Sequence, residues 1–281
     1  MTTGVFLIVL LAALIHAAWN AAAKGSADKM RFMVGLVLGH APFAALALLF
    51  APLPAWDCWP YVVGGAFLHL GYQLFLQQSY RHGDLTHVYP LARGTAPLLT
   101  AAISVLWLGE QLSAPAWAGI LVIAIGLMSL IFVRRADGIW DARSAATALV
   151  TGCFTAGYSI VDGAGARIGG TALGFYAILS LLNAAAMAGL MEWRRPGIVR
   201  DAVRFSLRPA LLAGGASFTA FALVIWAFTQ APIALVAALR ETSVIFALLI
   251  GVVVLKERLN LVKIFAATVT TSGALLVKLS R

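Results

Sequence analysis

Uninterrupted apolar runs, separated by short polar stretches, follow one another along the whole chain. They show neither the strict alternation of a barrel strand nor the broad polar face of a helix in a water-soluble protein. Runs of about 20 apolar residues suit helices that cross a bilayer, where the backbone must satisfy its own hydrogen bonds. The pattern predicts an all-α polytopic membrane protein with ten transmembrane helices, at about residues 3–23, 32–51, 58–79, 86–108, 115–133, 143–162, 171–191, 209–230, 233–255 and 261–278.

One of these runs occurs twice. Residues 88–112 and 235–259 align without a gap, so that Arg93 and Arg240 are 147 positions apart, as are Glu110 and Glu257. Duplicated halves that carry a charge at matching positions inside a span are typical of transporters built from internal repeats. We therefore expect two five-helix domains, residues 1–136 and 137–281.

Composition agrees with a membrane class. Hydrophobic residues make up 62% of the chain and charged residues 11%, with a mean hydropathy of +0.93, whereas a soluble domain carries about 25% charged residues. Two cysteines, Cys58 and Cys153, fit neither a disulfide framework nor a metal site. The first apolar run lacks a preceding basic segment and a small-residue cleavage site, so we expect a retained span and not a signal peptide.

The net charge of +9 does not indicate nucleic-acid binding, because nearly every Lys and Arg caps a span or lies in a short loop. Fifteen of the 20 basic residues fall on one side of the ten-span arrangement. Basic loops follow the first and third spans in one half, but the seventh and ninth in the other. Since five spans per half is an odd number, the second half enters the membrane upside down, as in an inverted repeat. The positive-inside rule places the basic side in the cytoplasm and both termini opposite.

The end of the fourth span carries a family resemblance. Pro97 is followed by Gly109, Glu110 and Leu112, and the second copy ends similarly at 256–259. With ten spans in two inverted halves, the chain resembles the drug/metabolite transporter superfamily, in particular the EamA-type exporters and permeases. The resemblance covers the whole chain and implies metabolite export or a related transport activity. The opening His16-Ala-Ala-Trp19-Asn20 also looks like a subgroup found with phosphonate-utilisation genes.

Polar residues inside apolar spans are costly and are the default candidates for a functional site. His16, Trp19 and Asn20 share one face of the first span, and His69 and Gln73 share one face of the third. Each has a structural alternative, as a hydrogen bond or a packing contact between helices. Further candidates for solute contact lie in later spans: Tyr89, Tyr158, Asn183 and Trp226. Glu110 and Glu257, at span ends, are expected to serve structure by closing the interface between the repeats.

Arg93 and Arg240 are the leading candidates, because equivalent positions of inverted repeats lie near the symmetry axis and the membrane midplane. A guanidinium facing a cavity suits a carboxylate, phosphate or phosphonate. Alternatively, the arginines only hold the bundle together by pairing with Asp162 or Glu241, the two candidates for proton coupling. Adjacent residues of a helix point about 100° apart. We therefore expect Glu241 to turn away from Arg240 and leave a net positive cavity.

The sequence predicts a secondary transporter of the inner membrane that moves a small polar metabolite by alternating access. The solute would be an amino acid or a related zwitterionic or anionic compound, phosphonates included. No nucleotide-binding G-x₄-G-K-[ST] motif is present, and no cofactor or metal is expected. The expected partners are the solute and membrane lipid, with the chain a monomer or homodimer. Alternatives are a flippase for a lipid-linked sugar, a sensor, or an integral-membrane enzyme. The last is disfavoured by scattered histidines and the lack of an H-E-x-x-H motif.

Overall fold

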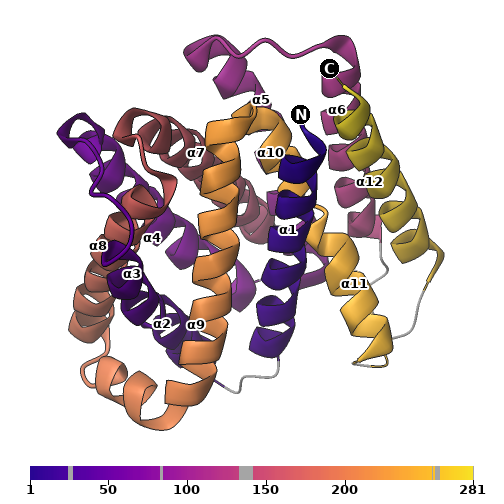
Figure 1. Cartoon of the computed structure of the whole chain (residues 1–281). Helices are drawn as coiled ribbons and strands as arrows, with labels where there is room; N and C mark the ends of the chain where they lie inside the picture. The colour runs from indigo at the N-terminus through magenta and orange to yellow at the C-terminus, as the bar shows by residue number, and fades with distance from the viewer. Residues whose placement is uncertain (25–27, 83–84, 133–141, 255, 257–259, 281) are drawn as a thin grey trace.

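The computed structural model describes residues 1–24, 28–82, 85–132, 142–254, 256 and 260–280. These residues form helices and no strand, so the predicted all-α class is confirmed. The helices (Figure 1) are α1 (Thr3–Lys24), α2 (Lys29–Leu38), α3 (His40–Leu48), η1 (Trp56–Cys58), α4 (Trp59–His82), α5 (Leu85–Leu108), α6 (Ala114–Ser129), η2 (Leu130–Phe132), α7 (Ala142–Gly169), α8 (Ala172–Arg194), α9 (Ile198–Gln230), α10 (Ile233–Arg240), α11 (Ser243–Val253) and α12 (Leu261–Leu279).

Seven segments in the described part of the chain are long and apolar enough to cross a membrane. They are Thr3–Ala21, Met30–Leu48, Leu91–Leu108, Ala172–Arg194, Leu207–Gln230, Ile233–Val253 and Leu261–Leu279. Helix α6 is apolar but has only 16 residues. Helices α4 and α7 underlie two more of the predicted spans and carry polar residues such as His69 and Asp162 inside them. Within the described residues, each of the ten predicted ranges therefore lies mostly on helix, while length and hydropathy alone support seven spans.

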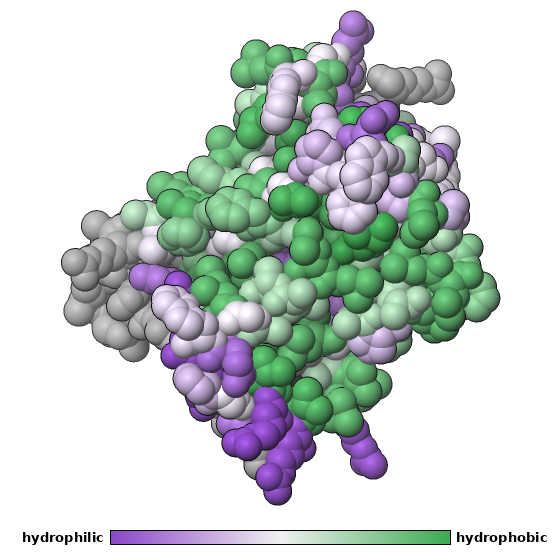
Figure 2. All heavy atoms as spheres, turned by 90° about the vertical axis from the view of Figure 1, so that its left-hand side faces the viewer, coloured by the Kyte–Doolittle hydropathy of each residue, from purple (hydrophilic) through white to green (hydrophobic). Residues whose placement is uncertain are grey.

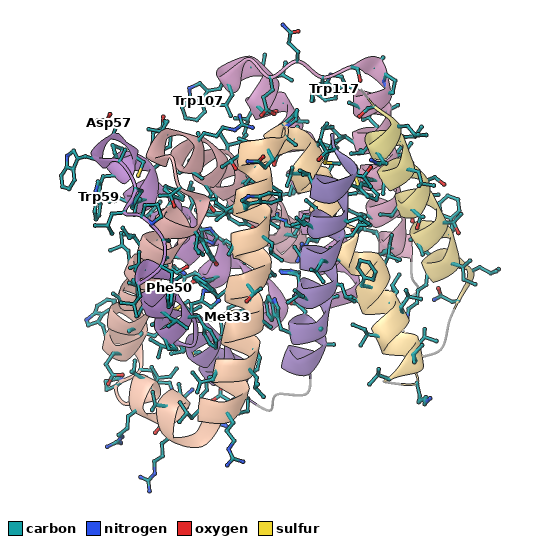
Figure 3. All side chains as sticks on the ribbon, viewed as in Figure 1. Met33, Phe50, Asp57, Trp59, Trp107 and Trp117 are labelled. Atoms are coloured by element: carbon teal, nitrogen blue, oxygen red, sulfur yellow. The ribbon has the colours of Figure 1, made fainter. Side chains whose placement is uncertain are left out.

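The outer surface is apolar in its middle. Large hydrophobic side chains such as Phe50, Leu106, Leu212 and Leu261 are more than three-quarters exposed. Figure 2 shows hydrophobic residues covering the middle of one face, with hydrophilic residues gathered toward the ends. Trp107 and Trp117 lie at the end that also holds both termini (Figure 3). An apolar belt with tryptophans near its edge is the surface expected in a bilayer.

Close backbone contact joins α6 to α12 along one edge of the bundle (Figure 1). A Cβ atom built on Gly119 would lie 3.0 Å from the carbonyl oxygen of Gly273, and one built on Gly273 would lie 2.8 Å from that of Gly119. Only residues without a side chain let two helix backbones approach this closely, which is the usual way helices associate in lipid.

Two predicted spans are each made of two helices. The second breaks at Gly39, between α2 and α3, where α9 approaches so closely that a Cβ would overlap the backbone of Ala210. The ninth breaks between α10 and α11, where the amides of Glu241 and Thr242 bond three residues back, to Ala238 and Leu239. Such tightened turns inside a helix interrupt its regular periodicity.

At the other end of the molecule, Asp28 connects two basic loops. Its carboxylate accepts a hydrogen bond from the Arg31 amide at 2.9 Å, which caps α2, and pairs with Arg195 at 3.3 Å. The Arg31 amide, followed by the Arg195 guanidinium, holds the pKa of Asp28 below its usual value. The loops after the first and seventh predicted spans therefore meet at one end of the bundle.

Candidate solute-binding site

A buried ionic cluster joins helices from both halves of the chain. Arg93 on α5 donates to Glu241 Oε2 at 3.0 Å, and Arg240, the last residue of α10, approaches Glu241 Oε1 at 3.4 Å. Arg93 Nη2 also lies 2.7 Å from His16 Nε2 on α1. Glu241 is fully buried and neither arginine is more than 6% exposed. The two arginines that the repeat places at equivalent positions thus share one carboxylate.

Glu241 does not turn away from Arg240, so our expectation for this residue was wrong. The expectation assumed a continuous helix, in which residues 240 and 241 point about 100° apart. The helix instead ends at Arg240 and tightens, and Glu241 lies between the arginines with one oxygen toward each. One carboxylate therefore pairs with two guanidinium groups, which leaves one positive charge in excess.

A second buried pair lies beside this cluster. His69 on α4 bonds Asp162 on α7 at 2.7 Å through Nε2. The His69 ring stacks on Tyr158 with 4.3 Å between ring centroids, and the Arg240 guanidinium carbon lies over the Tyr158 ring, 5.4 Å from its centroid. Tyr158 therefore contacts both the His69 ring and the Arg240 guanidinium through its π-face.

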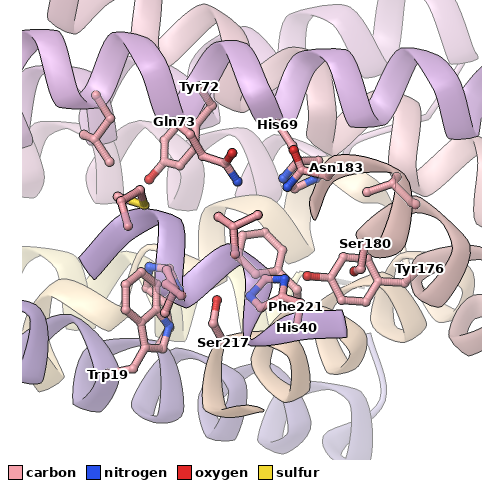
Figure 4. A pocket seen from close by; sticks show the side chains of 16 residues that line it. Trp19, His40, His69, Tyr72, Gln73, Tyr176, Ser180, Asn183, Ser217 and Phe221 are labelled. Atoms are coloured by element: carbon pink, nitrogen blue, oxygen red, sulfur yellow. The ribbon is translucent and has the colours of Figure 1, made fainter. Parts of the chain in front are cut away.

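Beside these groups is a small cavity whose volume is about 30 Å³. A water molecule occupies about 30 Å³ in the liquid, so the helices leave only a narrow space here. Figure 4 shows His69, Tyr72, Gln73 and Asn183 near one another, with Trp19, His40, Ser217 and Phe221 across from them. The sixteen lining residues include no Asp, Glu, Lys or Arg.

Several polar atoms in this region are buried without a hydrogen-bond partner among the described residues. Those that line the cavity are Trp19 Nε1, His40 Nε2, Gln73 Oε1 and Asn183 Oδ1. Arg240 Nε and Nη1, which do not line the cavity, are also buried without a hydrogen-bond partner among the described residues. Buried polar groups are normally hydrogen-bonded, and leaving one unmet costs about 1–3 kcal/mol. The unmet polar atoms on the cavity wall make this cavity the candidate site for a polar ligand.

The other predicted contact residues lie at different distances from this centre. Asn20 is half-buried and donates from Nδ2 to the His16 carbonyl at 2.7 Å, a contact within α1. Trp226 packs against the apolar core and does not line the cavity. Asp162 Oδ1 is buried without a hydrogen-bond partner among the described groups, and a Cβ on Gly65 would touch it. The Tyr89 side chain lies outside the described residues.

Glu110 lies away from the cavity and caps a helix. Its carboxylate accepts from the amides of Ile233 at 2.8 Å and Ala234 at 3.3 Å, the first residues of α10. Arg167 pairs with the same carboxylate at 3.0 Å and donates to two carbonyls at the end of α9. A carboxylate at a helix N-terminus is stabilised by the helix dipole. Glu257, its partner in the repeat, lies outside the described residues.

Five residues of the cavity wall were not among the predicted site residues: His40, Tyr176, Ser180, Ser217 and Phe221. Tyr176, Ser180 and Asn183 are spaced i, i+4 and i+7, so they share one face of α8, and this spacing was a usable signal. His40 was equally visible as a histidine within an apolar run. Phe221, whose ring meets those of His16, His69 and Tyr158, had no signal beyond its size.

The chain is similar to a known protein family and to a solved structure. Residues 2–132 match the model of the EamA-like transporter family. A crystal structure described only as "Crystal structure of protein" has a TM-score of 0.75, with 18% sequence identity and 99% of each chain covered. That likeness shows the fold over the full length and nothing about the ligand. No curated protein matches the chain.

The family match agrees with the motif at Glu110 and with the apolar belt around the buried polar centre. It confirms the predicted resemblance to the EamA-type permeases of the drug/metabolite transporter superfamily. Residues 2–132 therefore match the EamA-like transporter family, and the chain as a whole is a multi-pass membrane protein.

Proposed function

We propose that the chain is a ten-span secondary transporter of the inner membrane that moves a small anionic or zwitterionic metabolite by alternating access. An amino acid or a phosphonate-like compound fits this description. The observation that carries the proposal is Arg240, which is 3% exposed and has Nε and Nη1 without partners among the described groups. A carboxylate or phosphonate offers two oxygens to a planar guanidinium fork. Such a solute would satisfy the groups that the protein leaves unmet.

The solute's anionic group would compete with Glu241 for the arginines. In the closed bundle Glu241 neutralises one of the two positive charges. An incoming anion balances the second, so binding restores charge neutrality to a site that excludes water. The neutral cavity wall beside it, with Gln73, Asn183 and Trp19, would receive the rest of the molecule.

An inverted repeat, residues 1–136 and 137–281, is supported by the way contacts exchange between the halves. Helix α4 packs on α7, and their counterparts in the other half, α9 and α1, also pack on each other. At the edge of the bundle Gly119 faces Gly273. Moving each by 147 positions gives residues 266 and 126, and a Cβ on Gly126 would lie 3.2 Å from the carbonyl oxygen of Ala266. Equivalent contacts on both sides are what a two-fold relation in the membrane plane requires.

Proton coupling is assigned to the buried acids. Asp162 pairs with His69, and Glu241 pairs with both arginines. Either carboxylate would take a proton when its partner is drawn away by solute or by movement of a half-helix. Asp162→Asn is expected to abolish the response of transport to an imposed pH gradient, while solute exchange without a gradient continues.

The test is exchange of labelled solute into proteoliposomes that are preloaded with the same unlabelled compound. A panel of amino acids, phosphonates and organic anions is screened first with the parent protein. Arg240→Gln should remove saturable exchange, whereas Lys256→Gln, at an exposed position, should leave it unchanged. The proposal is overturned if no compound exchanges, or if Arg240→Gln exchanges like the parent.

A further inference from the structure

The first turns of α9 lie between two apolar spans and carry two parallel stripes. The apolar window of α8 ends at Arg194, and the next begins at Leu207. Between them, Val199, Val203 and Leu207 recur every fourth residue, and so do Arg200, Arg204 and Arg208. Residues four apart share a helix face. This segment therefore presents an apolar stripe beside a cationic one, which is the pattern of a helix that lies in the membrane interface.

An open groove runs between this segment and the end of α8. Its volume is about 650 Å³, and its lining joins Gly189 and Glu192 on α8 to Val203, Arg200 and Arg204 on α9. No atom lies within 4 Å of a Cβ built on Gly189, so the glycine leaves the floor of the groove open. Val203 is 49% exposed. The groove therefore combines apolar surface at Gly189 and Val203 with the arginine side chains of Arg200 and Arg204.

The carboxylate in the groove is already engaged by the protein. Glu192 accepts the amides of Gly197 at 2.6 Å and Val199 at 3.1 Å, which caps the start of α9. Gly197 supplies the left-handed backbone that this turn requires, with a φ of 88°. A negative charge held against a helix N-terminus is balanced by the helix dipole. Arg200 also lies within electrostatic reach of Glu192. Two arginines and one carboxylate line the groove, so its charged groups are net positive.

We propose that this groove binds one anionic phospholipid, with its phosphate between Arg200 and Arg204 and the upper part of an acyl chain along Val203. Charge complementarity favours this occupant over a neutral lipid, because guanidinium groups pair with phosphate and the apolar floor suits a chain. The neighbouring Trp193 is 79% exposed, as an interfacial tryptophan would be. Arg194, Arg195 and Arg208 add to the positive field at this end of the bundle. The positive-inside rule places the site in the cytoplasmic leaflet.

The experiment is native mass spectrometry of the full-length protein in detergent, titrated with phosphatidylglycerol or phosphatidylcholine of identical chains. Glycerol phosphate serves as the headgroup alone. We expect tighter binding of phosphatidylglycerol and no retention of glycerol phosphate, and binding should weaken as salt is raised. Arg200→Gln with Arg204→Gln should weaken phosphatidylglycerol about 30-fold, since each basic residue near an anionic surface contributes about fivefold.

A matched control removes two charges elsewhere at the same predicted side of the membrane, Lys256→Gln with Lys263→Gln. This variant should bind phosphatidylglycerol like the parent. Equal binding of the two lipids by the parent, retention of glycerol phosphate alone, or equal losses in both double variants would each overturn the proposal. If the arginine variant does not fold, the lipid preference and the salt dependence of the parent still decide the matter.

Discussion

The contact between Arg93 Nη2 and His16 Nε2, at 2.7 Å, fixes the protonation state of the histidine. A guanidinium can only donate, so His16 Nε2 must accept, and the ring is neutral with its proton on Nδ1. A second proton on Nε2 would set two donors against each other. His16 therefore gains a proton only when Arg93 moves away from it.

This relation predicts a pH effect on solute binding. If an anionic solute draws Arg93 away from His16, the ring becomes free to take up a proton, so such a solute should bind more tightly as the pH is lowered. In His16→Gln the side-chain oxygen can accept from Arg93 but does not titrate, and this pH dependence should disappear. Calorimetric titration across pH measures it, and Asp162→Asn serves as the control for the His69–Asp162 pair. A variant with the parent's pH profile would exclude His16 as the titrating group.

Replacing Arg93 with Lys should weaken solute binding by about 1.5–3 kcal/mol, the contribution of a hydrogen bond to a charged group. The fork of Arg93 reaches Glu241 and His16 on separate segments, and a lysine ammonium is a point charge on a flexible stem. Competition binding with the transported solute provides the measurement. If Arg93→Lys and Arg240→Lys both bind like the parent, the arginines do not anchor the solute and attention moves to His16, Trp19 and Asn20.

Removing the charge of Glu241 should lower the melting temperature of the solute-free protein and increase the stabilisation that an anionic solute provides. Glu241→Gln leaves two buried guanidinium groups without their shared carboxylate, a loss of about 3–5 kcal/mol when one partner of a buried pair is removed. The melting temperature of the free protein should fall. An anionic solute should then stabilise the variant by more than it stabilises the parent. A thermal unfolding series in detergent measures both shifts, and a parent-like melting temperature would contradict the ionic role of Glu241.

Glu110 and Arg167 should be energetically coupled. Glu110→Gln loses charge-assisted bonds to the first amides of α10, with an expected cost of about 0.5–2 kcal/mol, as for other helix caps. A double-mutant cycle with Arg167→Gln should give a coupling energy of about 0.5 kcal/mol or more, since the two groups are 3.0 Å apart. Asp57→Asn, at an exposed carboxylate, is the matched control. Strict additivity would show that the pair contributes nothing.

Two glycines should respond to alanine with opposite signs. At Gly273 a Cβ would lie 2.8 Å from the Ile123 amide nitrogen, so Gly273→Ala should force α6 and α12 apart at a cost of about 1–3 kcal/mol. At Gly189 nothing lies within 4 Å, and Gly189→Ala should gain about 0.5–1 kcal/mol from helix propensity. Unfolding free energies of the two variants would test the contact, and equal effects would argue against it.

Apolar runs alone predicted the helical class, because in lipid a spanning segment has no other way to satisfy its backbone. The register of 147 positions predicted that Arg93 and Arg240 would lie near each other, and both meet at Glu241. Local periodicity failed for Glu241 itself, because it holds only while the helix continues. The pairing of His69 with Asp162, 93 positions apart, and the capping of α10 by Glu110 depend on how helices pack, which the order of residues along one span does not encode.

The helix breaks at Gly39 and after Arg240 are two candidate hinge points beside the buried polar groups. His40 begins the half-helix after the first break, and Arg240 ends the half-helix before the second. A tilt of either half-helix carries one of these side chains with it, without bending an intact helix. The geometry of the buried polar groups is therefore tied to the angles between the half-helices, so a change in either angle also changes the distances between these groups.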